Sequence, residues 1–379
     1  MKILEITNVD FSLRHFLLPL MRGLRADGHE VVGVCADGPL LADVRGEGFR
    51  VETVPLVRSF SPLAQMQALI ALVRLIREEK PDIVHAHMPI SGLLGRLAAW
   101  LCRVPCVAYT CHGFLFNQPG PAPRRGLALV LEWLAGRITD RYFTVSVQEA
   151  EDARRLKIHP APLAVGNGRN PSLFQPDPEA RRRIRAELGV AEGAVVIIAV
   201  SRLVRHKGYP ELLKAMEQVS GAMLWVVGER LESDHGESLD SCFEEAQRVL
   251  GARLRCLGYR EDVPALLAAA DIFTLPSHFE GLPMSVIEAM LTGLPVVASD
   301  IRGPREQVVN GRTGLLVPPG EAVPLARSLG CLVRDPDLRY RMGEVGRERA
   351  RARYDEDIVV GRTKMALLAP GTTPTDDAG

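Results

Sequence analysis

Two glutamates eight residues apart mark the stretch of this sequence that most clearly suggests chemistry. The stretch is SHFEGLPMSVIEAM, and its glutamates are Glu280 and Glu288. Proline inside a helix would break it, so Pro283 predicts that a helix begins between the two glutamates. The predicted N-cap, Leu282, has no side-chain acceptor, which leaves the first helical amides to find another partner. Such amides attract anions, so the pattern predicts an anion site with a glutamate on either side.

A second feature is a pair of basic residues, Arg202 and Lys207, in the stretch SRLVRHKG. The apolar run at 194–201 predicts a buried strand, so both side chains are expected just past its carboxyl end. Arginine offers a bidentate fork and lysine a point charge, which together can hold a diphosphate. The alternative is a solvated basic loop, since Arg205 and His206 lie in the same turn.

The elements that would position these residues follow one pattern along the chain. Short apolar runs alternate with helical stretches, which favours a parallel sheet covered on both faces. The runs that predict strands are 2–8, 30–36, 49–56, 81–87, 106–113, 194–201, 222–229, 253–259, 271–277 and 295–300. The pattern restarts after a segment near 166–176, and 379 residues suffice for about two domains. The predicted fold class is therefore α/β, with two doubly wound domains that bind ligands beyond the carboxyl ends of their strands.

The composition narrows the classes of function. Lysine plus arginine and aspartate plus glutamate both total 46, so the charge does not indicate a nucleic-acid partner. No G-x-G-x-x-G follows the first strand of either half and no P-loop sequence occurs, which argues against a nicotinamide dehydrogenase. Seven cysteines without a paired framework predict a reduced, cytoplasmic protein. The N-terminal stretch does not read as a signal peptide, and no apolar window of about 18 residues predicts a membrane span.

Histidines and cysteines in the first half raise the question of a metal site. His85 and His87 are one residue apart on a predicted strand and therefore point to the same face. No third ligand with a suitable spacing accompanies them, which favours core or cleft histidines over a metal pair. The three cysteines before His112 match no zinc-binding pattern. We therefore predict no metal site.

The stretch PAPRRGLALVLEWLAGR, residues 121–137, is basic at its start and apolar after it. A helix of this kind can lie on a membrane surface, which would suit a polyprenyl-linked acceptor. The alternative is a helix packed between the sheet and the cleft, and we favour this second interpretation.

In their order along the chain, these motifs resemble the retaining glycosyltransferases of family 4, which have the GT-B fold. The second half carries SRLVRHKG, ADIFTLPS, the E-x7-E pattern in EGLPMSVIE, AMLTGLPVVASD and NGRTGLLVPPG. In the first half, DIVHAHMPISGLLGRLAAWL, YTCHGF, TDRYFTVS and VGNGRN resemble the capsular and exopolysaccharide branch of that family.

The resemblance runs from about residue 2 to residue 365 and implies two Rossmann-like domains that face each other across a cleft. An acceptor-binding domain is expected at 1–170 and a donor-binding domain at 171–350. A last helix at 351–368 would pack back on the first domain, and the tail at 370–379 is predicted to be disordered.

The resemblance also implies roles for individual residues. Arg202 and Lys207 match the pair that neutralises the diphosphate, and Glu288 matches the glutamate that accepts hydrogen bonds from the ribose. Glu280 matches the residue that faces the donor hexose, and we assign it to positioning, because the resemblance implies front-face displacement in which the leaving phosphate helps to deprotonate the acceptor. His112 matches a first-domain histidine that reaches the sugar. The expected residues are His112, Glu280, Arg202 and Lys207 for catalysis, Arg202, Lys207, Glu280, Gly281, Leu282, Met284, Ser285 and Glu288 for the donor, and His87 and Asn8 for the acceptor.

The function that this resemblance implies is transfer of a hexose or N-acetylhexosamine from a nucleotide-diphosphate sugar, with UDP favoured, onto a lipid-linked or growing glycan. No metal or other cofactor is expected, and the location would be cytoplasmic, with peripheral contact at the inner membrane. Two alternatives stay open: a nucleotide-sugar 2-epimerase on the same scaffold and a non-catalytic sugar-nucleotide-binding protein. Isomerisation of the donor alone would distinguish the first, and binding without turnover would distinguish the second.

Three departures from the family pattern stand out. The loop TNVDFSLRH lacks a glycine pair, GNGRN replaces Gly-Asn-Gly-hydrophobic-Asp, and VVGER lacks a second glycine. We expect none of them to affect Arg202, Lys207 or Glu288.

Overall fold

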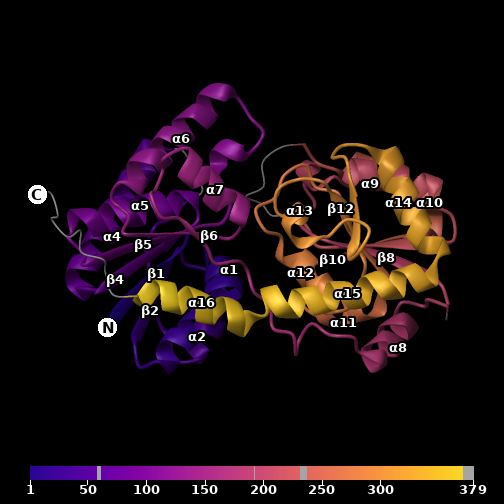
Figure 1. Cartoon of the computed structure of the whole chain (residues 1–379), viewed down its shortest axis with the longest axis horizontal. Coiled ribbons are helices and arrows are strands. Elements are labelled where there is room, and N and C mark those ends of the chain that lie inside the picture. The colour runs from indigo at the N-terminus through magenta and orange to yellow at the C-terminus, as the bar shows by residue number, and fades with distance from the viewer. Residues whose placement is uncertain (58–60, 192, 231–236, 370–379) are drawn as a thin grey trace, which may run out of the picture. The chain divides into compact units, whose positions relative to one another are not determined.

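The computed structural model describes residues 1–57, 61–191, 193–230 and 237–369, and the predicted disordered tail at 370–379 lies outside them. The chain divides into two compact units (Figure 1). The N-terminal unit consists of Met1–Gly166 with Asp357–Gly379, and the C-terminal unit consists of Asn167–Glu356.

The N-terminal unit is built on a parallel sheet with the strand order β3-β2-β1-β4-β5-β6-β7. Runs rich in valine and isoleucine form its strands, as expected for strands buried on both faces. The strands are β1 (Lys2–Ile6), β2 (Glu30–Cys35), β3 (Arg50–Thr53), β4 (Ile83–His87), β5 (Cys106–Cys111), β6 (Arg141–Thr144) and β7 (Leu163–Ala164).

Helices cover both faces of this sheet. The face that carries Ile3 packs against the π-helix η1, α2, α3 and α16, and the face that carries Leu4 packs against α4 and α5. The helices are α1 (Asp10–Ser12), η1 (Leu13–Leu17), α2 (Leu18–Ala26), α3 (Leu41–Gly46), α4 (Pro62–Glu79), α5 (Pro89–Leu101), the 3-10 turn η2 (Leu115–Asn117), α6 (Ala122–Gly136), α7 (Val147–Arg155) and α16 (Glu356–Leu368).

The C-terminal unit repeats this plan with the strand order β10-β9-β8-β11-β12-β13, again parallel. Its strands are β8 (Val195–Val200), β9 (Ala222–Val227), β10 (Leu254–Gly258), β11 (Ile272–Leu275), β12 (Val296–Ser299) and β13 (Gly314–Val317). Its helical elements are α8 (Pro178–Glu187), η3 (Arg205–Lys207), α9 (Tyr209–Gln218), α10 (Asp240–Leu250), η4 (Gly251–Arg253), α11 (Val263–Ala269), α12 (Met284–Leu291), α13 (Pro304–Gln307), α14 (Ala322–Arg334) and α15 (Pro336–Tyr354).

In each unit the strand order reverses beside the first strand. The reversal lies between β1 and β4 in the N-terminal unit and between β8 and β11 in the C-terminal unit. The loops at the carboxyl ends of such a strand pair diverge to opposite faces of the sheet and leave a crevice in which ligands bind. The two reversals therefore mark where each unit can hold a substrate.

The structure confirms the ten predicted strands to within a few residues and adds β6, β7 and β13, which are two to four residues long. It differs at the last helix, which was predicted over 351–368: α15 ends at Tyr354 and a new helix, α16, begins at Glu356. Helix α16 lies beside α2, where the Lys364 ammonium group donates to the carbonyl oxygen of Gly23 at 3.2 Å (Figure 1).

Candidate active site

Helix α12 begins at the strand-order reversal of the C-terminal unit, between the two glutamates as predicted. Its first residue is Met284, and its N-cap is Pro283 rather than Leu282. The backbone of Pro283 is extended, with ψ of 125°, so the helical conformation starts one residue later than predicted. No side chain caps the N-terminus of this helix. The first amides of α12 therefore remain available to an anion at this point.

Lys207 and Glu280 come together at this reversal from two different loops. The Lys207 ammonium group donates to Glu280 Oε1 at 2.7 Å, and both side chains are largely buried. Ser277, two residues after β11, also donates its hydroxyl group to Glu280 Oε1 at 2.7 Å. Two donors on one oxygen hold this carboxylate in a fixed orientation.

The two loops that carry this pair are joined by close backbone contacts. The amide of His278 donates to the carbonyl oxygen of His206 at 2.8 Å, and the His206 ring stacks on Phe279 with centroids 4.6 Å apart. Gly208 approaches Pro276 so closely that a Cβ atom would lie 2.0 Å from the Pro276 carbonyl oxygen. Only glycine fits at that distance, so Gly208 is what allows Lys207 to reach Glu280.

Arg202 lies two residues past the end of β8, as predicted, and its side chain is half-buried. It therefore belongs to the same reversal as Lys207, from the same strand-to-helix connection. Gly281, Leu282, Met284 and Ser285 lie in the loop and first turn of α12 that follow Glu280.

Glu288 is bound by an arginine, Arg169, that the sequence analysis did not place near it. The guanidinium Nε of Arg169 donates to Glu288 Oε1 at 2.6 Å, with the side chains 15% and 10% exposed. Arg169 is the arginine of GNGRN, so the expectation that this departure leaves Glu288 untouched is wrong. Residues 119 positions apart in the chain meet here because Asn167 also binds the loop before α12, donating to the Leu282 carbonyl oxygen at 2.8 Å.

A chain of hydrogen bonds lies at the strand-order reversal of the N-terminal unit. Glu5 on β1 accepts from both histidines of β4: His85 Nδ1 lies 3.1 Å from Oε1, and His87 Nε2 lies 2.7 Å from Oε2. At one end, His85 Nε2 is 2.8 Å from the Thr110 hydroxyl oxygen. At the other end, His87 Nδ1 is 3.3 Å from Nε2 of His112.

The pKa values in this chain are strongly shifted. Burial alone would raise the pKa of Glu5, but its charge interactions and hydrogen bonds with His85 and His87 outweigh burial and lower the pKa to about 2. Burial, followed by the charge on His85, lowers the pKa of His87 to about 4 despite Glu5. Burial and the two neighbouring histidines lower the pKa of His112 well below its ordinary value. At neutral pH, Glu5 in this hydrogen-bond chain is therefore an ionised carboxylate, and His87 and His112 are neutral.

The histidine pair thus has a third polar neighbour, contrary to expectation. Among the described residues, Glu5, His85 and His87 form the one group with three potential metal-binding atoms within 4.8 Å of one another. Each of these atoms has a hydrogen-bond partner within the chain. Glu5 was missed because it lies 80 residues from His85, and only the pairing of β1 with β4 brings them together.

Asn8 lies just after β1 and is buried. Its side-chain oxygen accepts from the amide of Ser91 at 2.9 Å, in the first turn of α5. Asn8 therefore ties the end of β1 to the helix that follows β4.

Helix α6 (Ala122–Gly136) is present where a helix was predicted at 121–137, and one side of it packs against α5 and η2. Of its residues only Ala135 and Gly136 are buried. Five large apolar side chains are 38% to 61% exposed: Leu127, Val130, Leu131, Trp133 and Leu134. None of the helices in the described residues is long and apolar enough to cross a membrane.

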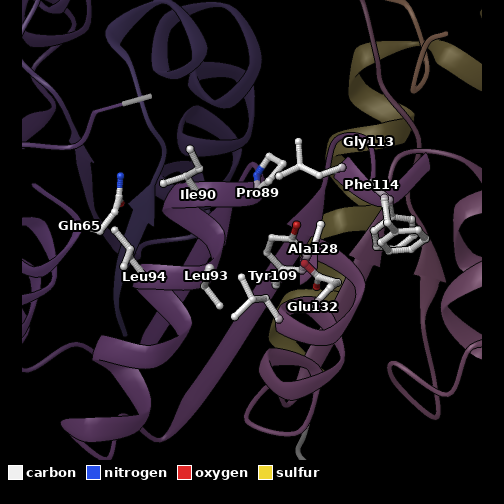
Figure 2. Close-up of a pocket in the computed structure, with 13 residues that line it drawn as sticks. Gln65, Pro89, Ile90, Leu93, Leu94, Tyr109, Gly113, Phe114, Ala128 and Glu132 are labelled. Atoms are coloured by element: carbon white, nitrogen blue, oxygen red, sulfur yellow. The ribbon is translucent and has the colours of Figure 1, made fainter. Parts of the chain in front are cut away.

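A pocket of about 200 Å³ lies beneath α6, bounded by α5, β5 and the loop after His112 (Figure 2). Its lining is mostly apolar and includes Leu93, Phe114 and Leu131. The one carboxylate in the lining, Glu132, is neutralised by buried Arg96 through two hydrogen bonds of 2.8 and 3.1 Å. The pocket is therefore suited to an apolar group, and its wall at Gly113 adjoins His112.

Two known protein families match this chain, one in each of its two units. The family model for the glycosyl transferase 4-like domain matches residues 13–168, and the model for glycosyl transferases group 1 matches residues 180–349.

Two relatives and one solved structure illustrate the similarity. The chain is 33% identical over 340 residues, 83% of its length and 86% of the other, to the UDP-Gal:alpha-D-GlcNAc-diphosphoundecaprenol alpha-1,3-galactosyltransferase of Escherichia coli. It is 26% identical, over 96% of its own length and 97% of the other, to a Campylobacter jejuni N,N'-diacetylbacillosaminyl-diphospho-undecaprenol alpha-1,3-N-acetylgalactosaminyltransferase. The crystal structure of Anabaena HepE in complex with UDP superposes with a TM-score of 0.82 at 23% identity, covering 97% of this chain and 99% of HepE. The fold is accordingly that of the GT-B proteins.

Proposed function

The chain belongs to the group 1 glycosyltransferases, and from this premise we propose that it transfers a hexose or N-acetylhexosamine from a UDP-sugar to a polyprenyl-diphosphate-linked acceptor, with retention at the anomeric carbon. The names of the Escherichia coli and Campylobacter jejuni relatives support an undecaprenyl-linked acceptor, and the first supports a UDP-linked donor. The role in the cell would be the synthesis of a surface polysaccharide.

The observation that carries the proposal is the meeting of Lys207, Glu280 and the start of α12 at one strand-order reversal. A nucleotide-diphosphate sugar has an anionic diphosphate beside a neutral, hydroxyl-rich sugar. The uncapped amides of α12, with Lys207 and Arg202, suit the diphosphate. Glu280 suits the sugar hydroxyl groups, because an ionised carboxylate accepts hydrogen bonds.

Glu288 would accept hydrogen bonds from the ribose hydroxyl groups. A carboxylate has about four acceptor positions on its two oxygens, so the bond from Arg169 to Oε1 leaves capacity for the ribose. Arg169 would hold the carboxylate in place before the donor arrives.

The chemical step follows from these assignments. The bond between the anomeric carbon and the diphosphate oxygen breaks while the acceptor oxygen bonds to the same face of that carbon. The acceptor proton passes to the departing phosphate oxygen. Lys207 and Arg202 stabilise the negative charge that develops on the leaving diphosphate, which is the work that a metal ion does in other transferases. Glu280 serves as a positioning group, since its pairing with Lys207 and Ser277 makes it a poor nucleophile.

The acceptor would bind the N-terminal unit, with His87 and Asn8 near its reversal. The exposed apolar face of α6 and the pocket beneath it would contact the polyprenyl chain at the inner membrane surface.

Turnover of UDP-sugars with undecaprenyl-diphosphate-linked monosaccharides tests the proposal. Lys207→Ala and Glu288→Ala should each lower kcat/KM by about a hundredfold or more, because each removes a charged contact to the donor. The matched control is Arg205→Ala, since Arg205 is exposed and pairs only loosely with exposed Glu237. Unchanged turnover in both variants would refute the site.

Further measurements test the stereochemistry, the epimerase alternative and the identity of the donor separately. NMR of the product should show the donor's anomeric configuration, and an inverted product would contradict retention. Isomerisation of the donor without acceptor would instead indicate an epimerase. In a thermal-shift screen, a UDP-sugar at about a hundred times its Kd should stabilise the protein by about 2.7 kcal/mol.

A further inference from the structure

In the buried hydrogen-bond chain of the N-terminal unit, the positions of the protons can be assigned by finding the groups that can accept a hydrogen bond but cannot donate one. Glu5 is ionised at neutral pH and therefore has no proton to donate. Its two neighbours, His85 Nδ1 and His87 Nε2, must both be the donors in their contacts with it. The neutral His87 ring thus carries its one proton on Nε2, and its Nδ1 has only a lone pair.

This assignment determines the state of the next ring. The contact between His87 Nδ1 and His112 Nε2 measures 3.3 Å, and a hydrogen bond there requires a proton on His112 Nε2. A neutral His112 that carries its proton on Nε2 has a lone pair on Nδ1. His112 is half-buried, whereas Glu5 and His87 are buried, so only the last ring of the chain is open to a substrate.

We propose that Glu5 is a positioning residue that acts through His87 to fix His112 in the tautomer protonated on Nε2. In this tautomer the lone pair on His112 Nδ1 accepts a hydrogen bond from a hydroxyl group of a sugar substrate. A buried carboxylate that fixes the tautomer of a reactive histidine is an established device in other enzymes. The inference rests on the proposed function for the identity of the sugar, but the assignment of the tautomer does not.

The opposite end of the chain provides a control. The Thr110 hydroxyl group contacts His85 Nε2 and so lies at the end of the hydrogen-bond chain opposite His112, although the Thr110 backbone pairs with His87 in the sheet. Replacing Thr110 with valine removes one hydrogen bond from the same buried chain without changing the acceptor that faces His87. A role that is merely structural would make Thr110 and Glu5 equivalent.

The first experiment is NMR of the whole protein with ring-15N histidine, the His112 signals being assigned by their loss in His112→Asn. At neutral pH the wild-type protein should show a protonated Nε2 and an unprotonated Nδ1 for His112. A proton on Nδ1 would overturn the proposal. Because this measurement needs no substrate, its failure is distinguishable from failure of the proposed function.

The second experiment compares Glu5→Gln, Glu5→Leu and Thr110→Val. In Glu5→Gln the amide can offer its oxygen to either histidine, and in Glu5→Leu no acceptor remains, so both should show two tautomers of His112. Their kcat should fall by about tenfold, as expected for one lost charge-assisted hydrogen bond, while KM for the donor changes by less than about threefold. Thr110→Val should keep the Nε2-protonated form and the wild-type kcat.

Two results would overturn the proposal: a single unchanged tautomer in the folded Glu5 variants, or an equal loss of kcat in Thr110→Val. Glu5→Gln keeps the volume of the side chain, so it carries the test if Glu5→Leu does not fold. Thermal unfolding of each variant identifies any loss of activity that reflects stability alone.

Discussion

At the residue scale, the candidate donor site is built from charged pairs rather than from isolated charges. Lys207 pairs with Glu280 and Arg169 pairs with Glu288, in both cases with side chains at most 15% exposed. Pairs this shielded from water are held far more firmly than exposed ones, because breaking one leaves a charge without a partner. They keep both carboxylates in place before any substrate arrives.

Arg169 offers the sharpest test of this pairing. Arg169→Leu should lower the free energy of unfolding by about 3 kcal/mol, because Glu288 would stay buried without its partner. It should also raise KM for the donor. Denaturant unfolding and steady-state kinetics measure the two effects.

The matched control is Arg305→Leu in the same unit, because Arg305 and its partner Asp300 are both about half exposed. Its effect on stability should stay within about 0.5 kcal/mol. If Arg169→Leu is equally mild, Arg169 does not hold Glu288. A double variant with Glu288→Gln should lose less than the sum of the single variants, because the two residues share one interaction.

At the element scale, the site depends on how closely the turn η3 approaches the end of β11. Gly208 has φ of 77° and lies against the Pro276 carbonyl oxygen. Glycine is needed here for two reasons: the backbone is left-handed, and there is no room for a Cβ atom. Helix α12 depends on the same loop, which ends at its uncapped N-terminus. The distance between these two elements sets the distance between Lys207 and Glu280.

Gly208→Ala should therefore destabilise the C-terminal unit by about 3 kcal/mol or more and abolish turnover, since left-handed backbone and a steric clash add together. The substitution Gly311→Ala measures the effect of the left-handed backbone without the steric clash. Gly311 has nearly the same φ, 76°, but a Cβ atom there would meet no atom within 4 Å. It should cost only about 1 kcal/mol and leave kcat unchanged. Equal effects of the two substitutions on kcat would show that the approach to Pro276 does not matter.

At the scale of the whole molecule, the net charge provides no attraction to a membrane. Basic and acidic residues are equal in number, 46 of each, so any attraction must come from one surface. We propose the exposed apolar residues of α6 as that surface, and Arg137 near its end lies over the Trp133 ring at 3.9 Å. An apolar face beside basic residues is typical of helices that lie in a lipid interface.

We expect Leu127→Glu with Leu134→Glu to lower binding to anionic phospholipid vesicles by about tenfold or more, because two large apolar contacts are lost. Cosedimentation measures the bound fraction. Both side chains are more than half exposed, so thermal stability should not change. Val249→Glu on α10 of the C-terminal unit is the control, being 57% exposed. An equal loss of binding in this control would remove α6 as the membrane-binding surface.

The sequence alone was sufficient for the strands, the two-domain class and the family. Buried parallel strands are continuous apolar runs such as VVIIAV at 195–200, and this local signal does not depend on the rest of the chain. It missed β6, β7 and β13, which are two to four residues long. A proline between Glu280 and Glu288 was likewise enough to predict that a helix begins between them, although the first helical residue was misplaced by one.

Only the tertiary structure decided which of these residues touch. Glu5 reaches His87, and Arg169 reaches Glu288, across 82 and 119 residues of chain. No spacing in the sequence records such contacts, because they arise from the pairing of strands and the docking of a loop on a helix. The sequence also did not reveal that α6 is exposed, because exposure depends on which distant segments the fold brings next to the helix. Its apolar pattern is equally suited to a protein core and to a lipid surface, and only the neighbours that the fold brings to it distinguish the two.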